Sequence, residues 1–176
     1  WVIVDDATSL QVQGLPTAPV SYATHTGNNL LSYSYSDDQL LDDALSGTDA
    51  NSLTQAIYGE GIMAANTDVG WVGSMTGFEA GSGYWFVATA PFQFEYNAPA
   101  SGTLFRLAEL PKPPQLLQFT QSMNQYFYLI TEAVVDNVEL TTGDWLVAKC
   151  NDTVVGSRQY VAGSTIDIPI MGYVND

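Results

Sequence analysis

The chain has 176 residues, of which 46% are apolar and 12% aromatic, so it holds enough apolar material for a packed core and we expect an ordered fold. Nineteen acidic residues against four basic ones give a net charge of −15, which disfavours binding to nucleic-acid phosphates and to anionic membranes. The single cysteine, Cys150, excludes both an intrachain disulfide framework and a cysteine-based zinc site.

Short runs of β-forming residues, separated by Gly, Asn, Asp and Pro, follow one another along the chain. They predict a mainly β fold of small β-sheet or sandwich modules with a short helical insertion around residues 37–58, and an α+β fold is the alternative. The predicted strands cover residues 1–4, 10–12, 20–24, 30–35, 62–65, 71–74, 84–88, 92–96, 116–121, 126–131, 145–150, 153–157 and 166–170.

The helical insertion is predicted from the spacing of Leu40, Leu41, Ala44 and Leu45, which places apolar residues on one face of a helix. We expect this helix over residues 36–45, capped by Ser36 or Asp37. A second short helix is expected over residues 50–58, ending before Gly59.

Prolines 111, 113 and 114 interrupt this pattern, because they continue neither a helix nor a central strand. They predict a stiff linker over residues 109–116 between a complete β-rich module at 17–108 and a second β module at 117–176 that we expect to be truncated.

The segment 1–16 has the same Trp-led order of strand, turn, apolar-Gln-apolar strand and proline as the segment 85–99. We interpret 1–16 as the terminal hairpin of a preceding copy of the module, as in repeat arrays. The chain also begins without Met on a predicted strand, so we expect a further segment before it. The alternative is chance similarity between two hairpins.

Two stretches resemble modules of known large proteins. The first comprises Tyr58–Asn66, Gly70-Trp-Val-Gly-Ser-Met-Thr76 and Gly81-Ser-Gly-Tyr-Trp85. It resembles the GWVGSLT…GYW-type repeat modules of large virion structural proteins of marine tailed phages, including cyanophages, and of large secreted proteins of marine bacteria. The second runs from Phe119 to Gly172 and is similar to the module that often follows such repeats. The resemblance implies surface or virion architecture, and it implies no catalytic residue.

Catalytic motifs are lacking in the sequence. His25 is the only histidine, and nothing beside it matches a nucleophile elbow or a triad signature. The Gly81–Gly83 segment leads into a predicted strand, unlike a phosphate-binding loop. Among the acids that could serve a glycosidase, Glu60 is the strongest candidate, because the flanking Gly59 and Gly61 leave its carboxylate exposed on a flexible bend. We therefore predict no enzyme activity, no catalytic residues and no cofactor.

Calcium is the one metal ion that the acidic turns favour, because it binds carboxylate and amide oxygens. The weak candidate ligands are Asp136, Asn137, Glu139 and Asp152, and ordinary acidic turns are the alternative.

Asp144 and Arg158 lie on neighbouring predicted strands, and we predict a structural ion pair between them.

Trp71, Trp85 and Trp145 are interpreted either as anchors of the core or as a stacking platform for sugars. We expect a non-enzymatic structural or interaction module of a large modular protein on a virion surface or outside the cell, such as a capsid, tail or fibre component. Its partners would be other protein subunits, copies of itself or a cell-surface glycan, and neither nucleic acid nor membrane. The alternative is a carbohydrate-binding or adhesive module of a secreted bacterial protein.

Overall fold

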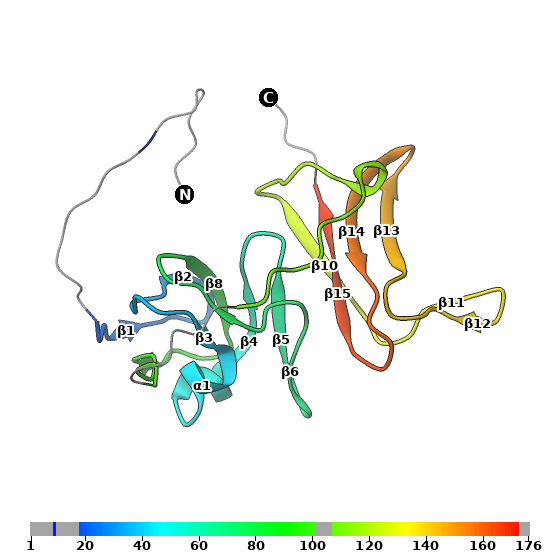
Figure 1. Ribbon diagram of the computed structural model, residues 1–176. Coiled ribbons are helices and arrows are strands. Elements are labelled where there is room, and N and C mark those ends of the chain that lie inside the picture. The colour runs from blue at the N-terminus through cyan, green and yellow to red at the C-terminus, as the bar shows by residue number, and fades with distance from the viewer. Residues whose placement is uncertain (1–8, 10–17, 101–106, 173–176) are drawn as a thin grey trace.

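The computed structural model describes residues 9, 18–100 and 107–172 (Figure 1). The fold is mainly β, as predicted, with 41% of these residues in strands and 9% in helices. Strand pairing divides into two groups: strands between Tyr22 and Phe94 pair only with one another, and so do strands between Gln125 and Met171. We call these groups the first and the second module. The predicted terminal hairpin at 1–16 lies outside the described residues, Ser9 excepted.

A five-stranded antiparallel sheet forms the centre of the first module. Its strands, in spatial order, are β2 (Gly27–Ser32), β8 (Gly83–Ala88), β4 (Thr54–Tyr58), β5 (Met63–Thr67) and β6 (Gly70–Val72). Two smaller pairs flank it, namely β1 (Tyr22–Ala23) with β9 (Gln93–Phe94), and β3 (Gln39–Leu40) with β7 (Gly77–Phe78).

Two short helices lie between β3 and β4: α1 (Leu41–Leu45) and α2 (Asp49–Leu53). The helix expected from residue 36 begins later, because 39–40 pair with β7, and its N-cap is Leu40 instead of Ser36 or Asp37. No helix within the described ranges has the length and apolar character needed to span a membrane.

The second expected helix, 50–58, is wrong beyond Leu53. Residues 54–58 form β4, which pairs with β8 on one side and with β5 on the other. Ala56 and Ile57 fit a helical spacing, but both neighbouring strands offer backbone hydrogen bonds to this segment, so tertiary pairing overrides the local pattern.

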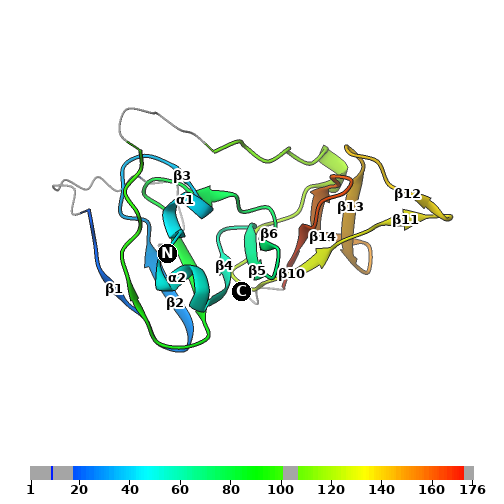
Figure 2. The same ribbon diagram turned by 90° about the horizontal axis from the view of Figure 1, so that it is seen from below.

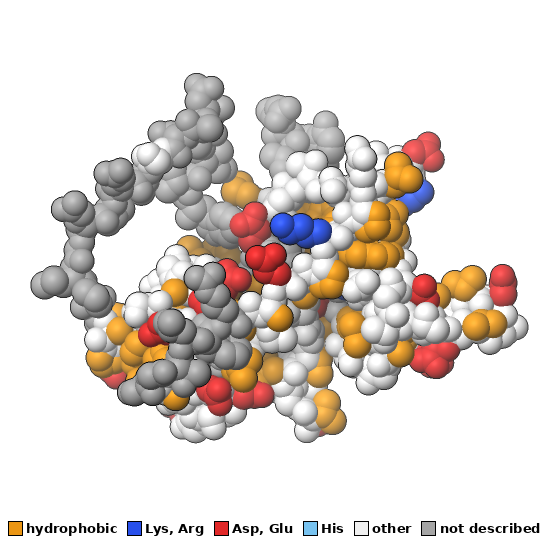
Figure 3. Space-filling view, viewed as in Figure 1, with side chains coloured by type: hydrophobic (Ala, Val, Ile, Leu, Met, Phe, Trp, Pro, Cys, Tyr) orange, Lys and Arg blue, Asp and Glu red, His pale blue; other side chains and the backbone are white. Residues whose placement is uncertain are grey.

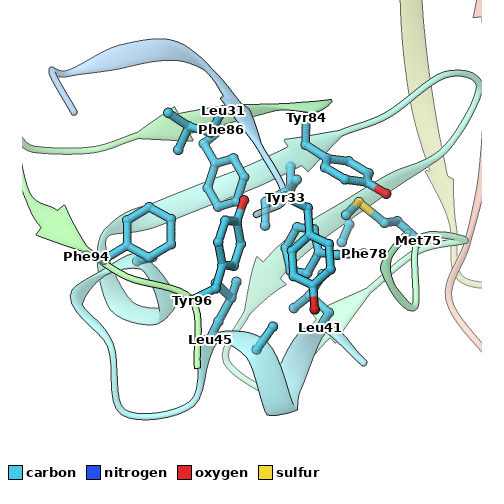
Figure 4. Close-up of a cluster of buried hydrophobic side chains, with 14 of the residues drawn as sticks. Leu31, Tyr33, Leu41, Leu45, Met75, Phe78, Tyr84, Phe86, Phe94 and Tyr96 are labelled. Atoms are coloured by element: carbon cyan, nitrogen blue, oxygen red, sulfur yellow. The ribbon is translucent and has the colours of Figure 1, made fainter. Parts of the chain in front are cut away.

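Tyrosine and phenylalanine side chains fill the core of the first module, on one face of the sheet (Figure 4). Phe78 lies at the centre, with its ring centroid 5.0–6.0 Å from those of Tyr33, Tyr84, Phe86 and Tyr96. The edge-to-face and stacked geometries are those that aromatic pairs favour. Helix α1 covers this cluster with its buried residues Leu41, Ala44 and Leu45.

The second module is built on two antiparallel pairs. β10 (Gln125–Ile130) pairs with β15 (Ile166–Met171), and β13 (Trp145–Cys150) pairs with β14 (Thr153–Gln159). β14 lies beside β15, where Gly156 touches the backbone of Pro169 and leaves no room for a Cβ atom. A hairpin of β11 (Val134–Val135) and β12 (Val138–Glu139) extends away from the other strands of the second module (Figures 1 and 2).

Two further expectations are wrong. The predicted strand 116–121 is instead a 3₁₀ turn, η1 (Gln115–Leu117), followed by chain outside any strand. The segment 85–99 is not a hairpin either, because β8 pairs with β2 and β4 whereas β9 pairs with β1. β8 and β9 therefore do not pair with each other across a turn. Each belongs to a different sheet and pairs with strands that are distant in the sequence.

We predict opposite effects for two Tyr-to-Phe substitutions in the core. The Tyr33 hydroxyl donates a buried 2.9 Å hydrogen bond to Gln39 Oε1, so Tyr33→Phe leaves a buried acceptor unpaired and lowers the free energy of unfolding by about 1–2 kcal/mol. The buried Tyr96 hydroxyl has no partner among the described residues, so Tyr96→Phe leaves stability unchanged or raises it by up to about 1 kcal/mol. Urea unfolding measures both values, and a loss in Tyr96→Phe equal to that in Tyr33→Phe would contradict the assignment.

We also predict a loss of stability in alkali. Burial raises the pKa of Tyr33, Tyr84 and Tyr96 above the ordinary value of 10.0, so the folded state favours the neutral phenol. The stabilisation that this preference gives is complete below pH 10. It is lost as the pH rises above the pKa that the same tyrosine hydroxyls have in the unfolded chain. The ultraviolet absorbance of tyrosinate should therefore show these three residues ionising only as the protein unfolds. Comparison with Tyr-to-Phe variants assigns the signal, and reversible ionisation of Tyr33, Tyr84 or Tyr96 in the folded state would contradict this.

Candidate binding cleft between the two modules

The outer face of the five-stranded sheet carries an unusual row of apolar side chains. Trp85 on β8 lies opposite Leu30 on β2 and Tyr58 on β4. Its neighbours Tyr84 and Phe86 point to the other face, into the core, because side chains alternate along a strand. The outer face of this sheet is therefore apolar as well as the inner one, so another part of the protein must cover it.

The second module covers part of that face with β10. The Tyr58 and Phe127 rings stack with centroids 5.6 Å apart and planes inclined by 26°, and burial raises the pKa of the Tyr58 hydroxyl. Gln125 fixes the contact at the backbone: its Nε2 donates to Gly59 O at 2.9 Å, and Gly61 N–H donates to its Oε1 at 3.1 Å. The β4–β5 turn is thereby tied to the first residue of β10.

A buried ion pair between Asp167 and Arg158 makes the second and stronger connection. Arg158 Nη2 lies 3.0 Å from Asp167 Oδ2, with the two side chains 12% and 0% exposed. The Ser74 N–H donates to Asp167 Oδ1 and the Ser74 hydroxyl donates to Oδ2, while Arg158 Nη2 also donates to Gly61 O at 2.6 Å. Asp167 and Arg158, both in the second module, thus each form hydrogen bonds with backbone groups of the first module.

The predicted pair of Asp144 with Arg158 is therefore wrong. The Asp144 carboxylate accepts hydrogen bonds from the N–H and the hydroxyl of Thr141, in the turn before β13. Arg158 lies opposite Leu146 in the β13–β14 register, and its guanidinium extends toward β15 and the first module. Residues 144 and 158 belong to neighbouring strands in the sequence, but β14 also lies beside β15, and β15 supplies the acid that pairs with Arg158.

A cleft of about 850 Å³ lies beside the Tyr58–Phe127 stack, between the two modules. Trp85, 38% exposed, lines it from the first module, and Tyr126, 73% exposed, lines it from the second. Asn28 and Glu60 add polar groups to the lining. The full lining is Asn28, Tyr58, Glu60, Trp85, Val87, Gln121, Ser122, Met123, Gln125, Tyr126 and Phe127.

A second cavity, of about 920 Å³, is reached from the other side of Glu60. Glu79, Glu109 and Lys112 also line it, and among the described residues the only aromatic one in its lining is Tyr84, which is buried in the core.

The three tryptophans do not form one platform. Trp71 is half-buried on β6, where its Nε1–H donates to Asn51 Oδ1 at 2.8 Å, and Trp145 is half-buried on β13 of the other module. Only Trp85 faces the cleft. Sequence reasoning identified Trp85 but missed Asn28, Tyr58 and Tyr126 as its neighbours, since only the long-range pairing of β2, β4 and β8 and the docking of β10 bring them together.

The weak calcium candidates are separated by the fold. Asp136 and Asn137, with φ of 52° and 63°, form the two-residue turn of the β11–β12 hairpin, and Glu139 follows on β12. Asp152 lies in the turn between β13 and β14. Within the described part of the chain, no three acidic, histidine or cysteine residues lie close enough together to hold a metal ion.

His25 lies in the segment between β1 and β2, and its Nδ1 is 2.9 Å from its neighbour's carbonyl, Thr26 O.

We predict that Asp167→Ala lowers the free energy of unfolding by about 3–5 kcal/mol, because it leaves Arg158 buried without a counter-charge. The double variant Asp167→Leu with Arg158→Met should recover part of this loss, since it removes both charges. Urea unfolding measures each value, with the exposed Asp152→Asn as a control that changes stability by less than about 0.5 kcal/mol. A loss in Asp167→Ala no larger than in the control would show that the pair does not hold the modules together.

No protein-family model, curated protein or solved structure matches the chain. The resemblance of the Gly70–Thr76 and Phe119–Gly172 segments to phage and bacterial modules therefore stays a prediction. What can be said of function depends on the geometry of the two modules and of the cleft between them.

Proposed function

We propose that this chain is a non-enzymatic structural module of a large modular protein on a virion surface or outside the cell, and that it associates with copies of itself through the second module. The observation that carries this proposal is the apolar surface of β10, β11 and β12. The exposed apolar residues on these strands outside the cleft are Tyr128, Leu129, Val134, Val135 and Val138.

These exposed apolar side chains lie on neighbouring segments of the chain, and soluble proteins rarely expose large apolar patches that serve no contact. Figure 3 shows hydrophobic side chains together with acidic ones on the hairpin of β11 and β12. The hairpin extends from the body of the module, and its two strands pair only with each other. Such an element can pack against, or extend, the sheet of a neighbouring subunit.

The buried Asp167–Arg158 pair supports the same proposal, because it makes the two modules a single building unit. A structural component must keep its surfaces at fixed distances. An ion pair of the second module that is hydrogen-bonded to Ser74 and Gly61 of the first serves that requirement better than a flexible linker.

The net charge of −15 sets the conditions under which such subunits associate. At low ionic strength the acidic copies repel one another, whereas about 0.5 M salt, as in sea water, reduces the screening length to ~4 Å. The apolar contact is not weakened by salt. We therefore expect assembly to strengthen as the salt concentration rises, the reverse of what an electrostatic interface would show.

Sedimentation velocity over a range of protein and salt concentrations tests the proposal. We predict reversible self-association that increases with salt and is weakened by at least about tenfold in Tyr128→Lys and in Val135→Lys, since each places a charge in the apolar contact. Val69→Lys is the matched control, because Val69 is also exposed, at 89% against 65% for Tyr128 and 59% for Val135, but lies in the β5–β6 turn of the first module. A chain that stays monomeric at every salt concentration, or that responds equally to all three substitutions, contradicts association through this surface.

A further inference from the structure

We propose that the cleft between the two modules binds a neutral sugar ring, which stacks on Trp85 and is hydrogen-bonded by Asn28 and Glu60. This ligand site is additional to the proposed structural function and lies on a different surface from the β11–β12 hairpin.

The first argument is the position of Trp85. Its neighbours in sequence are buried core residues, yet Trp85 itself is 38% exposed and lines a cleft. Tyr126, 73% exposed, lines the same cleft from the second module. Aromatic faces are apolar but tolerate polar edges nearby, so they suit a ligand that has an apolar C–H face and a polar rim. A pyranose ring has both.

The second argument is the polar lining. The Asn28 side chain and the Glu60 carboxylate both line the cleft, and neither makes a hydrogen bond or ion pair with any residue of the described ranges. An amide offers one acceptor and two donors, and a carboxylate accepts at two oxygens, so the pair can bind several hydroxyl groups at once. Gln121 and Gln125, by contrast, are hydrogen-bonded to each other, and Gln125 is also hydrogen-bonded to the β4–β5 turn. We therefore expect them to hold the shape of the cleft and not to bind the ligand's hydroxyl groups.

The third argument is charge, which selects among ligands with hydroxyl groups. Among the residues that the structure describes, no lysine, arginine or histidine lines the cleft, and Glu60 adds a negative charge to it. Phosphate, sulfate and uronic acid groups would meet repulsion without a counter-charge. The cleft therefore favours a neutral sugar over an anionic one.

The fourth argument is rigidity. The Tyr58–Phe127 stack and the Gln125 hydrogen bonds lie at the base of the cleft, and the Asp167–Arg158 pair fixes the same two modules nearby. The cleft is therefore formed before a ligand arrives, which lowers the entropic cost of binding. A side chain from a second copy of the protein is the rival occupant, but an apolar side chain would leave Asn28 and Glu60 desolvated and unpaired.

The test is a titration of the full chain with a panel of soluble neutral oligosaccharides of glucose, galactose, mannose and N-acetylglucosamine. Tryptophan fluorescence and the NMR signals of the indole N–H groups report binding. We expect saturable binding of at least one panel member, weakened by at least about tenfold in Trp85→Ala and in Tyr126→Ala. Asn28→Ala should weaken it severalfold, and the Trp145→Phe and Val69→Ala controls should bind as the unchanged chain does.

Three results would overturn the proposal: no panel member binds at millimolar concentration, binding survives both aromatic substitutions, or an oligogalacturonate binds more tightly than every neutral sugar. Sedimentation of Trp85→Ala distinguishes a sugar from the rival occupant, a side chain of a second copy. If Trp85→Ala loses self-association and the unchanged chain binds no sugar, a second copy fills the cleft. Salt-dependent assembly through Tyr128 and Val135 is measured independently, so the failure of this proposal leaves that one standing.

Discussion

The Asp167 carboxylate, buried with the Arg158 guanidinium at the contact between the two modules, is the interaction on which the rest of the arrangement depends. Its charge is balanced within the second module, but its remaining hydrogen bonds come from Ser74 of the first. Separation of the modules would expose a charged pair whose geometry is complete only when they are docked. Separation would leave Arg158 and Asp167 paired with each other but would remove their hydrogen bonds to Ser74 and Gly61. Hydrogen bonds to charged groups contribute about 1.5–3 kcal/mol each, so they favour the docked arrangement.

That docking determines the fate of the outer face of the five-stranded sheet. Without β10, the row of Leu30, Trp85 and Tyr58 would be an open apolar surface. With it, Tyr58 is stacked on Phe127, while Trp85 stays partly open in the cleft. A pocket with aromatic walls is thus a by-product of two sheets that meet over part of their faces, and its shape is held by the polar contacts at its base.

The molecule combines strong acidity with exposed apolar side chains, and these two properties limit association in opposite directions. Repulsion between acidic copies acts over the screening length, whereas the apolar contact acts only at close range. Together they favour association at high ionic strength over association at low ionic strength, as the proposed self-association requires.

Several features follow from the sequence alone, because they depend on neighbours a few residues apart. Alternation places Tyr84 and Phe86 on one face of a strand and Trp85 on the other, the Asp136-Asn137 pair favours a two-residue turn, and the proline cluster around 111–114 ends both helix and sheet. The mainly β fold and the approximate positions of most long strands could therefore be predicted.

Contacts between distant segments could not be predicted from the sequence. Residues 54–58 have a helical spacing but form a central strand, because β8 and β5 pair with them from both sides. Arg158 binds Asp167 instead of Asp144, and β9 pairs with β1 instead of β8, since nothing local distinguishes one partner from another. The sequence by itself determined which segments can be strands and which residues can be buried. Only the tertiary structure decided which strands meet, which acid neutralises the arginine and which tryptophan faces the cleft, because those choices depend on the free energy of the whole packed chain.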